Sequence, residues 1–221
     1  MAVEKKLIKK ALNDYDVKKF LEKELERAGV SEISIQKTPI ATRISILVRR
    51  PGIVVGKKGK AIKELCDELQ QRFGIENPQI EVVEVMRPEL DAKLMAEKIG
   101  KQIEMNPSVK PIIRSTLREI MESGAIGAEI RVAGKIIGKG AKAKALTMRS
   151  GYLKKSGEAM KLVKEGRYVV YLNAGAIGIQ VRIVPPDTKF SDKIRIEDMV
   201  FESEQPQLQA AEVENAAEKK N

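Results

Sequence analysis

The sequence reads Val54-Val55-Gly56-Lys57-Lys58-Gly59-Lys60-Ala61-Ile62 at the point that decides the fold. Its two glycines allow a sharp turn and let a ligand approach the main chain, because neither carries a Cβ atom. Residues 60–73 have apolar side chains at helical spacing, so the turn leads into a helix N-terminus with free N–H groups and a positive dipole end. Apolar residues 53–55 and Ile62 are expected to form the floor of a narrow groove beside it. Such a loop is suited to holding a sugar–phosphate strand.

The same stretch resembles the core signature of a KH domain, Val-Ile-Gly-x-x-Gly-x-x-Ile. Around it we expect a helix over 16–28, strands near 33–35 and 42–48, a short apolar helix, the helix over 60–73 and a strand over 80–85. This order, αββααβ, resembles the type II KH domain, whose loop clamps about four nucleotides of single strand. The resemblance assigns RNA binding to Gly56, Lys57, Lys58, Gly59 and Lys60. A bare Gly-x-x-Gly also marks ordinary turns, so that interpretation stays open.

After Pro88 the pattern starts again. Apolar spacing predicts helices over 94–103 and 109–121, and alternation predicts strands over 129–132 and 179–184. The motif Gly-Ala-Ile-Gly occurs at 124–127 and again at 175–178, which indicates two strands of one sheet with Arg131 and Arg182 on their outward faces. We therefore expect a two-domain α+β (α/β) chain, in which the KH domain precedes a C-terminal α/β domain with two helices packed on a mostly antiparallel sheet. The expected divisions are an N-terminal segment (1–15), the KH domain (16–86), the C-terminal domain (87–186) and an acidic, flexible tail (187–221).

Composition excludes several kinds of active site. The 221 residues include no His and one Cys, which removes Ser-His-Asp triads, His-ligated metals and Cys-cluster sites. We predict no catalytic residue, no cofactor and no metal. A nuclease that holds Mg²⁺ through carboxylates remains an alternative, although no paired-carboxylate motif is visible. No apolar run reaches the ~18 residues that span a bilayer, so a membrane partner is not expected.

The charge is positive and unevenly distributed. Lys and Arg number 41 against 31 Asp and Glu, for a net charge of +10. Residues 187–221 hold nine acids and five bases, so this stretch carries −4 and residues 1–186 carry +14. The densest surplus lies between Gly134 and Arg167, and a basic surplus of this kind favours nucleic acid as partner. The RNA-binding candidates there are Lys135, Lys139, Lys142, Lys144, Arg149, Lys154 and Lys155, with Arg131 on the neighbouring strand. A plain solvated loop is the alternative.

A second basic group lies on the helix predicted over 109–121. Lys110, Arg114 and Arg118 are four residues apart, so they share one face of that helix. We count all three as RNA-binding candidates. Glu122 continues the row and offers Arg118 an ion pair instead.

Two further stretches add to the KH signature: residues 117–127 followed by 129–135, and residues 175–183. Together the three resemble the small-subunit ribosomal protein three family, in its archaeal type, over residues 16–184. The resemblance implies a non-enzymatic structural constituent of the small ribosomal subunit, cytoplasmic as part of the ribosome. Its implied partners are small-subunit ribosomal RNA, messenger RNA at the entry channel and neighbouring proteins of the subunit head. A free KH-type regulator that binds single-stranded RNA is the alternative function.

The resemblance also implies a role for the first of the basic helix residues. In the family, basic residues on this helix face the messenger RNA entry channel. Lys110 and Arg114 match two of three such positions, and Pro111 occupies the third, where the family usually has Arg. Arg118 is not part of that set. The departure at Pro111 weakens the expectation that this chain opens messenger RNA structure.

Overall fold

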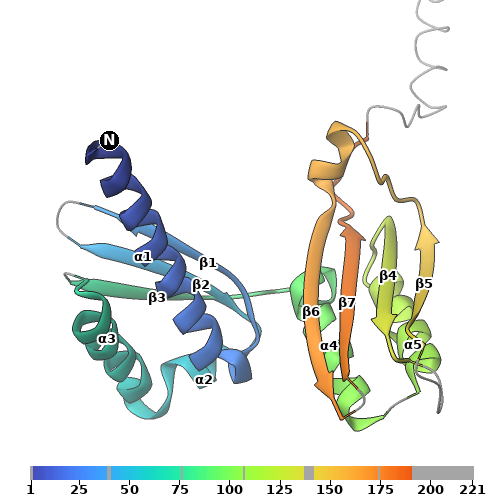
Figure 1. Ribbon diagram of the computed structural model, residues 1–221, viewed down its shortest axis with the longest axis horizontal. Helices are drawn as coiled ribbons and strands as arrows, with labels where there is room; N and C mark the ends of the chain where they lie inside the picture. Colours follow the sequence, from blue (N-terminus) through green and yellow to red (C-terminus); the bar gives the residue numbers. More distant parts are fainter. Residues whose placement is uncertain are drawn as a thin grey trace, which may run out of the picture. The chain divides into compact units, whose positions relative to one another are not determined.

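The structure is a computed structural model that describes residues 2–38, 41–75, 77–106, 108–136, 142–173 and 175–190. Its first half contains three strands and three α-helices (Figure 1). In chain order the elements are α1 (Ala2–Glu24), η1 (Glu26–Ala28), β1 (Val30–Lys37), β2 (Thr42–Val48), α2 (Pro51–Val55), η2 (Lys57–Gly59), α3 (Lys60–Phe73) and β3 (Pro78–Glu84). The predicted order αββααβ is confirmed.

The three strands form a mixed sheet in the order β1-β2-β3. β1 pairs with β2 antiparallel and β2 pairs with β3 parallel, with Ile33 opposite Ile46 and Ile44 opposite Ile80. Because alternate residues of a strand point to the same side, the apolar residues of all three strands gather on one face. Helices α1 and α3 cover that face. The core comprises Val17, Leu21, Leu25, Ala28, Val30, Ile33, Ile44, Ile46, Val48, Val54, Leu65 and Leu69.

Helix α1 is longer than the sequence pattern predicted. We expected it to begin at a cap at Asp16, but it begins at Ala2. Residues 2–15 contain neither Gly nor Pro and are rich in Ala, Leu and Lys, which favour the helix, so nothing local stops it at Asp16. The predicted core face, with Val17 and Leu21, is confirmed by their burial.

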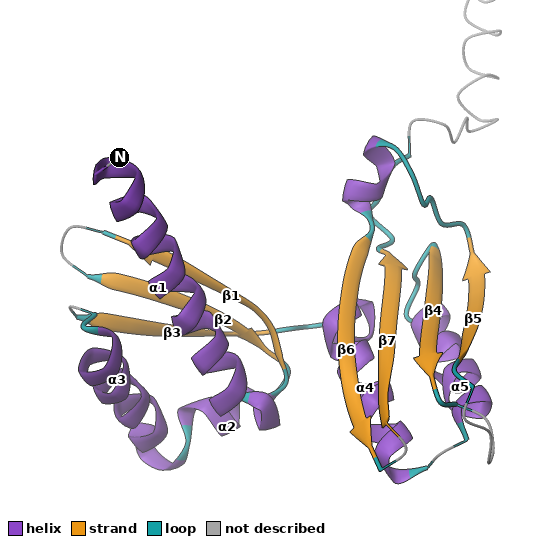
Figure 2. Ribbon diagram, viewed as in Figure 1, coloured by secondary structure: helices purple, strands orange, loops and turns teal. Residues whose placement is uncertain are grey.

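The second half is a four-stranded sheet with two helices on one of its faces (Figure 2). The strand order is β5-β4-β7-β6, and every neighbouring pair is antiparallel. This confirms the expected fold class, including the pairing of the two strands that follow the repeated Gly-Ala-Ile-Gly. The elements are η3 (Pro88–Leu90), α4 (Ala92–Met105), α5 (Val109–Glu122), β4 (Gly127–Gly134), β5 (Lys144–Gly151), η4 (Glu158–Leu162), β6 (Lys164–Leu172) and β7 (Gly175–Val184).

Helix α4 packs very closely on β6. Its N-terminal cap is Asp91, whose carboxylate accepts hydrogen bonds from the backbone N–H groups of Lys93 (2.9 Å) and Leu94 (3.4 Å). A Cβ at Gly166 would lie 2.3 Å from the backbone of Ala92. Gly166 therefore sets how closely the first turn of α4 approaches the strand.

Strands β5 and β6 were missed by the sequence analysis. We interpreted Gly134–Arg167 as one basic, glycine-rich stretch, whereas it contains β5 and the start of β6. In β5 only Leu146 and Met148 pack against the core, and the other residues of the strand are polar, charged or small. The alternation of apolar and polar residues that marks a strand is therefore weak. In the part of the chain that the structure describes, no helix combines the length and apolarity needed to cross a membrane.

Candidate nucleic-acid interface

The Gly56–Gly59 loop is built from left-handed backbone. Gly56, Lys58 and Gly59 have φ angles of +66°, +55° and +74°. A side chain at Gly56 is excluded on two grounds, since its Cβ would lie 2.7 Å from the Cβ of Ala61 and its φ favours glycine. The N–H of Gly56 donates a hydrogen bond to the carbonyl of Gly52 (3.1 Å), which closes the turn after α2.

The other glycine of the loop leaves its outer side open. A Cβ built at Gly59 meets no atom within 4 Å, so the main chain there is accessible. Helix α3 begins at the next residue, which places its N-terminal N–H groups at the same point. Lys57, Lys58 and Lys60 are all exposed around it. The loop thus combines bare backbone, a helix N-terminus and three cationic side chains, which suits a phosphate strand.

The expected apolar floor of the groove is partly corrected. Val54 has no exposed surface and belongs to the core of the first half, so it anchors α2 and does not line a groove. Ile53 and Val55, its neighbours, are exposed, and Ile62 is half-buried. The reason is helical geometry, because consecutive residues of a helix point in different directions. Only Ile53, Val55 and Ile62 are accessible to a ligand.

The basic row on α5 faces solvent. Val109, Ile113 and Ile120 form the buried side of the helix, while Lys110, Arg114 and Arg118 are exposed. None of the three forms an ion pair with a described residue, so the alternative pairing of Arg118 with Glu122 is not seen. Pro111 lies exposed in the first turn, where its missing N–H costs nothing.

The candidates between Gly134 and Arg167 have different surroundings. Lys135, Lys142, Lys144 and Arg149 are exposed, the last two on β5, whereas Lys154 is half-buried. Lys139 lies outside the described residues. Lys155 forms an ion pair with Glu129, whose side chain is only 6% exposed. Its charge is used within the protein, so Lys155 is the weakest RNA-binding candidate of this group.

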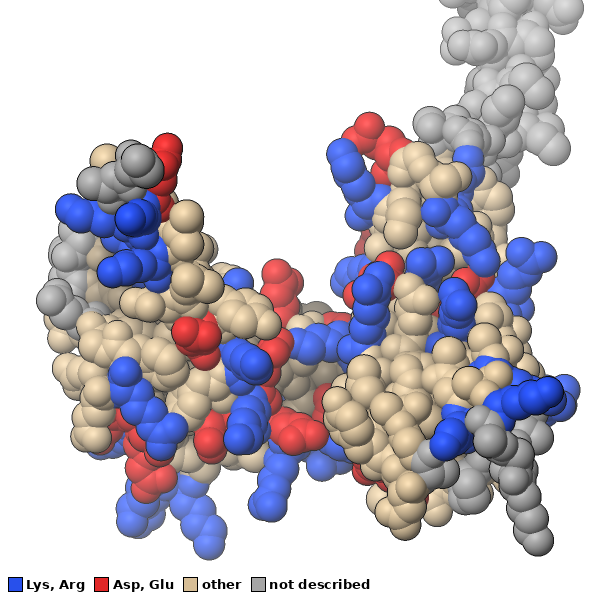
Figure 3. Space-filling view, viewed as in Figure 1, with Lys and Arg blue, Asp and Glu red and all other residues tan. Residues whose placement is uncertain are grey.

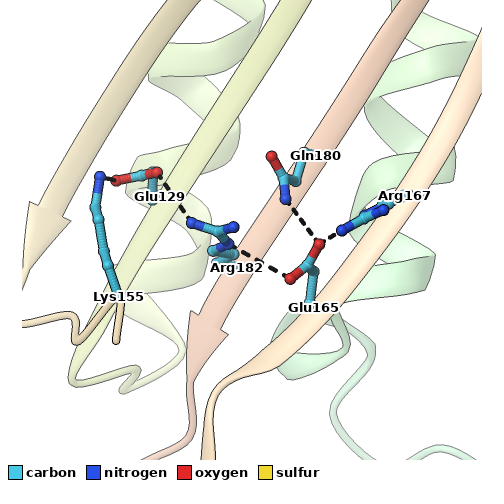
Figure 4. A network of polar contacts seen from close by, with 6 residues as sticks. All are labelled: Glu129, Lys155, Glu165, Arg167, Gln180 and Arg182. Atoms are coloured by element: carbon cyan, nitrogen blue, oxygen red, sulfur yellow. Dashed lines mark hydrogen bonds and ion pairs between the residues drawn. The ribbon is translucent and has the colours of Figure 1, made fainter. Parts of the chain in front are cut away.

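The partner of Lys155 belongs to a polar network on the uncovered face of the sheet (Figure 4). Arg182 on β7 lies between two carboxylates, with Nη1 3.8 Å from Oε1 of Glu129 and Nε 3.5 Å from Oε2 of Glu165. Gln180 and Arg167 donate hydrogen bonds to Oε1 of Glu165 at 2.7 and 2.6 Å. The amide of Gln180, followed by Arg167, lowers the pKa of Glu165 below its usual value of 4.5. Both carboxylates of this network therefore have basic partners within the protein: Glu129 is paired with Lys155 and Arg182, and Glu165 with Arg167 and Arg182.

The sheet separates the basic residues of the second half into two surfaces. Helices α4 and α5 lie behind the sheet in Figure 1, on the face that buries Ile130, Val132 and Ile179. Arg131 and Arg182 are on the opposite, uncovered face, as the sequence predicted. The row on α5 and the arginines of the uncovered face thus belong to different sides of the same domain.

Sequence reasoning missed one exposed aromatic residue on this uncovered face. Tyr171 on β6 is 82% exposed and Val169, two residues earlier, is 49% exposed. The run Tyr168-Val169-Val170-Tyr171-Leu172 is typical of a strand and was the available signal. It begins one residue after the basic stretch Gly134–Arg167.

Comparison with known protein families matches both halves of the chain. Residues 16–90 match the family model described as KH domain, and residues 99–183 match the one described as ribosomal protein S3, C-terminal domain. A protein of Methanoculleus marisnigri named small ribosomal subunit protein uS3 is 41% identical over 87% of this chain and 82% of its own length. The chain belongs to the uS3 family. Proteins of the same name from Methanoregula boonei and Methanobrevibacter smithii are each 40% identical, over 89% and 88% of this chain and 84% and 77% of theirs.

The uS3 matches cover the candidate site residues of both halves. The KH match contains the Gly56–Gly59 loop, and the C-terminal match contains α5 and the whole four-stranded sheet up to Ile183. The relatives come from methanogens, which agrees with the expected archaeal type, and their shared name is that of a ribosomal protein and not of an enzyme. Among the described residues, no three His, Cys, Asp or Glu side chains are grouped in a way that could hold a metal ion.

Proposed function

We propose that this chain is a structural, RNA-binding constituent of the small ribosomal subunit. The observation that carries the proposal is the joining of a KH domain to a ribosomal protein S3 C-terminal domain, in a chain about 40% identical over nearly nine tenths of its length to proteins named for that subunit. The geometry supports it, because the Gly56–Gly59 loop presents bare backbone, a helix N-terminus and lysines on one accessible surface.

In this proposal the basic residues contact RNA of two kinds. Ribosomal RNA of the subunit is bound by the KH loop, residues 56–60, and by Arg131, Lys135, Lys139, Lys142, Lys144, Arg149, Lys154 and Lys155. Messenger RNA passes Lys110 and Arg114 of α5 at the entry channel, whereas Arg118, one turn farther along the helix, binds RNA outside that pair. The exposure of Lys110, Arg114 and Arg118, and their freedom from ion pairs with described residues, support the assignment of this row. Neighbouring proteins of the subunit head complete the set of partners.

The division of the chain belongs to the same proposal. We place an N-terminal segment at 1–15, the KH domain at 16–86, the C-terminal domain at 87–186 and an acidic tail at 187–221. The first family-model match, 16–90, begins with the proposed KH domain and ends four residues beyond it, and the second match, 99–183, lies inside the proposed C-terminal domain.

Sedimentation of the native protein tests the proposed function. A cell extract is separated on a sucrose gradient, first at low salt and then after a high-salt wash, and the protein is detected by immunoblot. A structural constituent co-sediments with small subunits under both conditions, because many simultaneous contacts resist counterion competition better than one. Recovery only in the soluble top fractions would reject the proposal and favour the free KH-type regulator.

A further inference from the structure

The uncovered face of the C-terminal sheet is ordered into rows by the strand register. Arg149, Glu129, Arg182 and Glu165 form one row across β5, β4, β7 and β6, with alternating charge. The next row, on the side toward Tyr171, is Thr147, Arg131, Gln180 and Arg167, and it contains no acid. The row after that is Ala145, Ala133, Gly178 and Val169, which are small or apolar. The face therefore changes from a charge-balanced end to an uncharged end.

The uncharged end is a shallow hollow with an aromatic residue at its border. Ala133, Gly178 and Val169 line the hollow, and Arg131 and Arg167 stand at its edge. Tyr171 follows Val169 on the same face of β6, opposite Ala176, and is almost fully exposed. Figure 3 shows this face, with an uncharged area over the lower ends of β4, β6 and β7 and Lys and Arg side chains above it and to its right.

The charges beside the hollow are positive and available. The acids of this face, Glu129 and Glu165, are both engaged in the network of Figure 4, so they do not repel an anion strongly. Arg131 forms no hydrogen bond or ion pair with any residue in the described ranges, and Lys135 extends over Gly175 at the same end of the sheet. An occupant of the hollow thus meets a flat floor, an exposed ring and unpaired cations.

We propose that this face binds unpaired nucleotides of RNA, with a base stacked on the ring of Tyr171 and a phosphate held by Arg131. The inference rests on the proposed RNA-binding function and extends it to a second site, separate from the KH loop. Every nucleobase has a flat face that stacks on an aromatic side chain, and the flanking phosphates complement the arginines. A floor of Ala and Gly leaves room for a ribose and base to lie against the strands.

Charge favours RNA over a protein as the occupant. A protein interface would be expected to bury apolar side chains larger than Ala and Gly, and among the described residues of this face only Val169 and Tyr171 supply them. Arg131 at the edge of the hollow forms no ion pair with a described residue, so it favours an anionic partner, whereas Arg167 is already paired with Glu165. Paired RNA is disfavoured, because the bases of a duplex are stacked on one another and are not available to Tyr171.

Equilibrium binding of a fluorescein-labelled ten-nucleotide oligo(U) to the full chain tests the inference. All variants carry Gly59→Asp, so that the KH loop does not mask the second site. We expect Tyr171→Ala to weaken binding about tenfold through loss of stacking, and Tyr171→Phe to bind within about twofold of the parent. Tyr15→Ala is the matched control, because Tyr15 is a 61% exposed tyrosine on α1. Arg131→Ala should lower the salt slope of log K by about one.

The outcomes separate this inference from the proposed function. If Tyr171→Ala binds oligo(U) as tightly as the parent, the site is rejected, while sedimentation of the wild-type chain with small subunits still supports the ribosomal role. If Tyr171→Ala leaves oligo(U) affinity unchanged but reduces co-sedimentation, a protein covers the face and the inference is also rejected. Equal loss for Tyr171→Phe and Tyr171→Ala would contradict stacking as the cause.

Discussion

The two glycines of the KH loop are required for different reasons, although both are simply Gly in the Gly-x-x-Gly motif. Gly56 faces inward, where a Cβ would collide with Ala61, whereas Gly59 faces open space and needs only its left-handed backbone. A substitution at Gly56 therefore tests folding and one at Gly59 tests ligand approach. Asn and Asp tolerate left-handed backbone better than other side chains, which makes Gly59 the position for a charge experiment.

We expect Gly59→Asp to abolish RNA binding at the loop, because the carboxylate would stand where a phosphate approaches the N-terminus of α3. Gly59→Asn has nearly the same shape without the charge and serves as the control. It should retain most of the affinity of the wild type. The measurement is binding of single-stranded RNA to the isolated chain, with circular dichroism to verify folding. Equal loss in both variants would show that bulk, and not charge, is responsible.

Glu165 gives the charged network a dependence on acid. Its pKa is lowered in the folded protein, so its contribution to stability is present above its usual value of 4.5 and is lost as pH falls through the lowered value. Glu165→Gln should therefore reduce the urea midpoint of unfolding at pH 7, and this reduction should shrink as the pH falls below 4.5. Glu158→Gln, at an exposed position, is the control and should show no such pH dependence. A difference that does not shrink between pH 7 and the lowest pH at which the protein stays folded would contradict the assignment.

At the scale of elements, the contact between α4 and β6 defines the core of the C-terminal domain. Two glycines make it possible: Gly166 under Ala92, and Gly100 under the ring of Tyr168, where a Cβ would lie 2.5 Å from a ring carbon. Ridges of side chains do not separate the helix from the strand at these points. The distance between α4 and β6 is therefore set by the hydrogen atoms of these two glycines, and it leaves no room for a methyl group at either position.

Gly166→Ala should destabilise the domain by about 1–3 kcal/mol, because the added methyl forces α4 and β6 apart. Gly178→Ala is the matched control on the neighbouring strand. Its Cβ would meet only the carbonyl of Ala133, at 3.9 Å, so its unfolding midpoint should be unchanged or slightly raised. Urea unfolding of the two variants provides the comparison. Similar midpoints for Gly166→Ala and the wild type would mean that the helix shifts without cost.

The basic row on α5 carries the proposed contact with messenger RNA. Replacement of Lys110 and Arg114 by Ala should impair translation of structured messages more than that of unstructured ones, because fewer cations hold the separated strand. Lys18→Ala is the control, since Lys18 is an exposed lysine on α1 outside the row. Reporter messages with and without a stable hairpin, translated by ribosomes that carry each variant, give the ratio. Equal loss on both messages would reject the role of this pair.

For the whole molecule, the sequence predicted the fold more completely than the surfaces. The spacing of apolar residues and the positions of the glycines were sufficient to predict the order αββααβ. They were also sufficient for the central strands β4 and β7, where buried Ile and Val alternate regularly. The edge strand β5 was not found, because only Leu146 and Met148 of its residues pack against the core. Strand β6 was missed although the run over residues 168–172 is typical of a strand. Likewise, the basic surplus predicted Lys155 as an RNA-binding residue, and only the tertiary structure could show that Lys155 forms an ion pair with Glu129. Side-chain partners from distant segments are not encoded in local spacing.

Burial of Val54 gives the KH loop a thermodynamic consequence. The residue that anchors α2 in the core stands two positions before Gly56, so the loop keeps its shape only while the N-terminal domain is folded. A ligand held by the loop then binds the native state and not the unfolded one, and by mass action it raises the free energy of unfolding. In a particle where RNA is present in excess, RNA binding would therefore contribute to the free energy of unfolding of this domain.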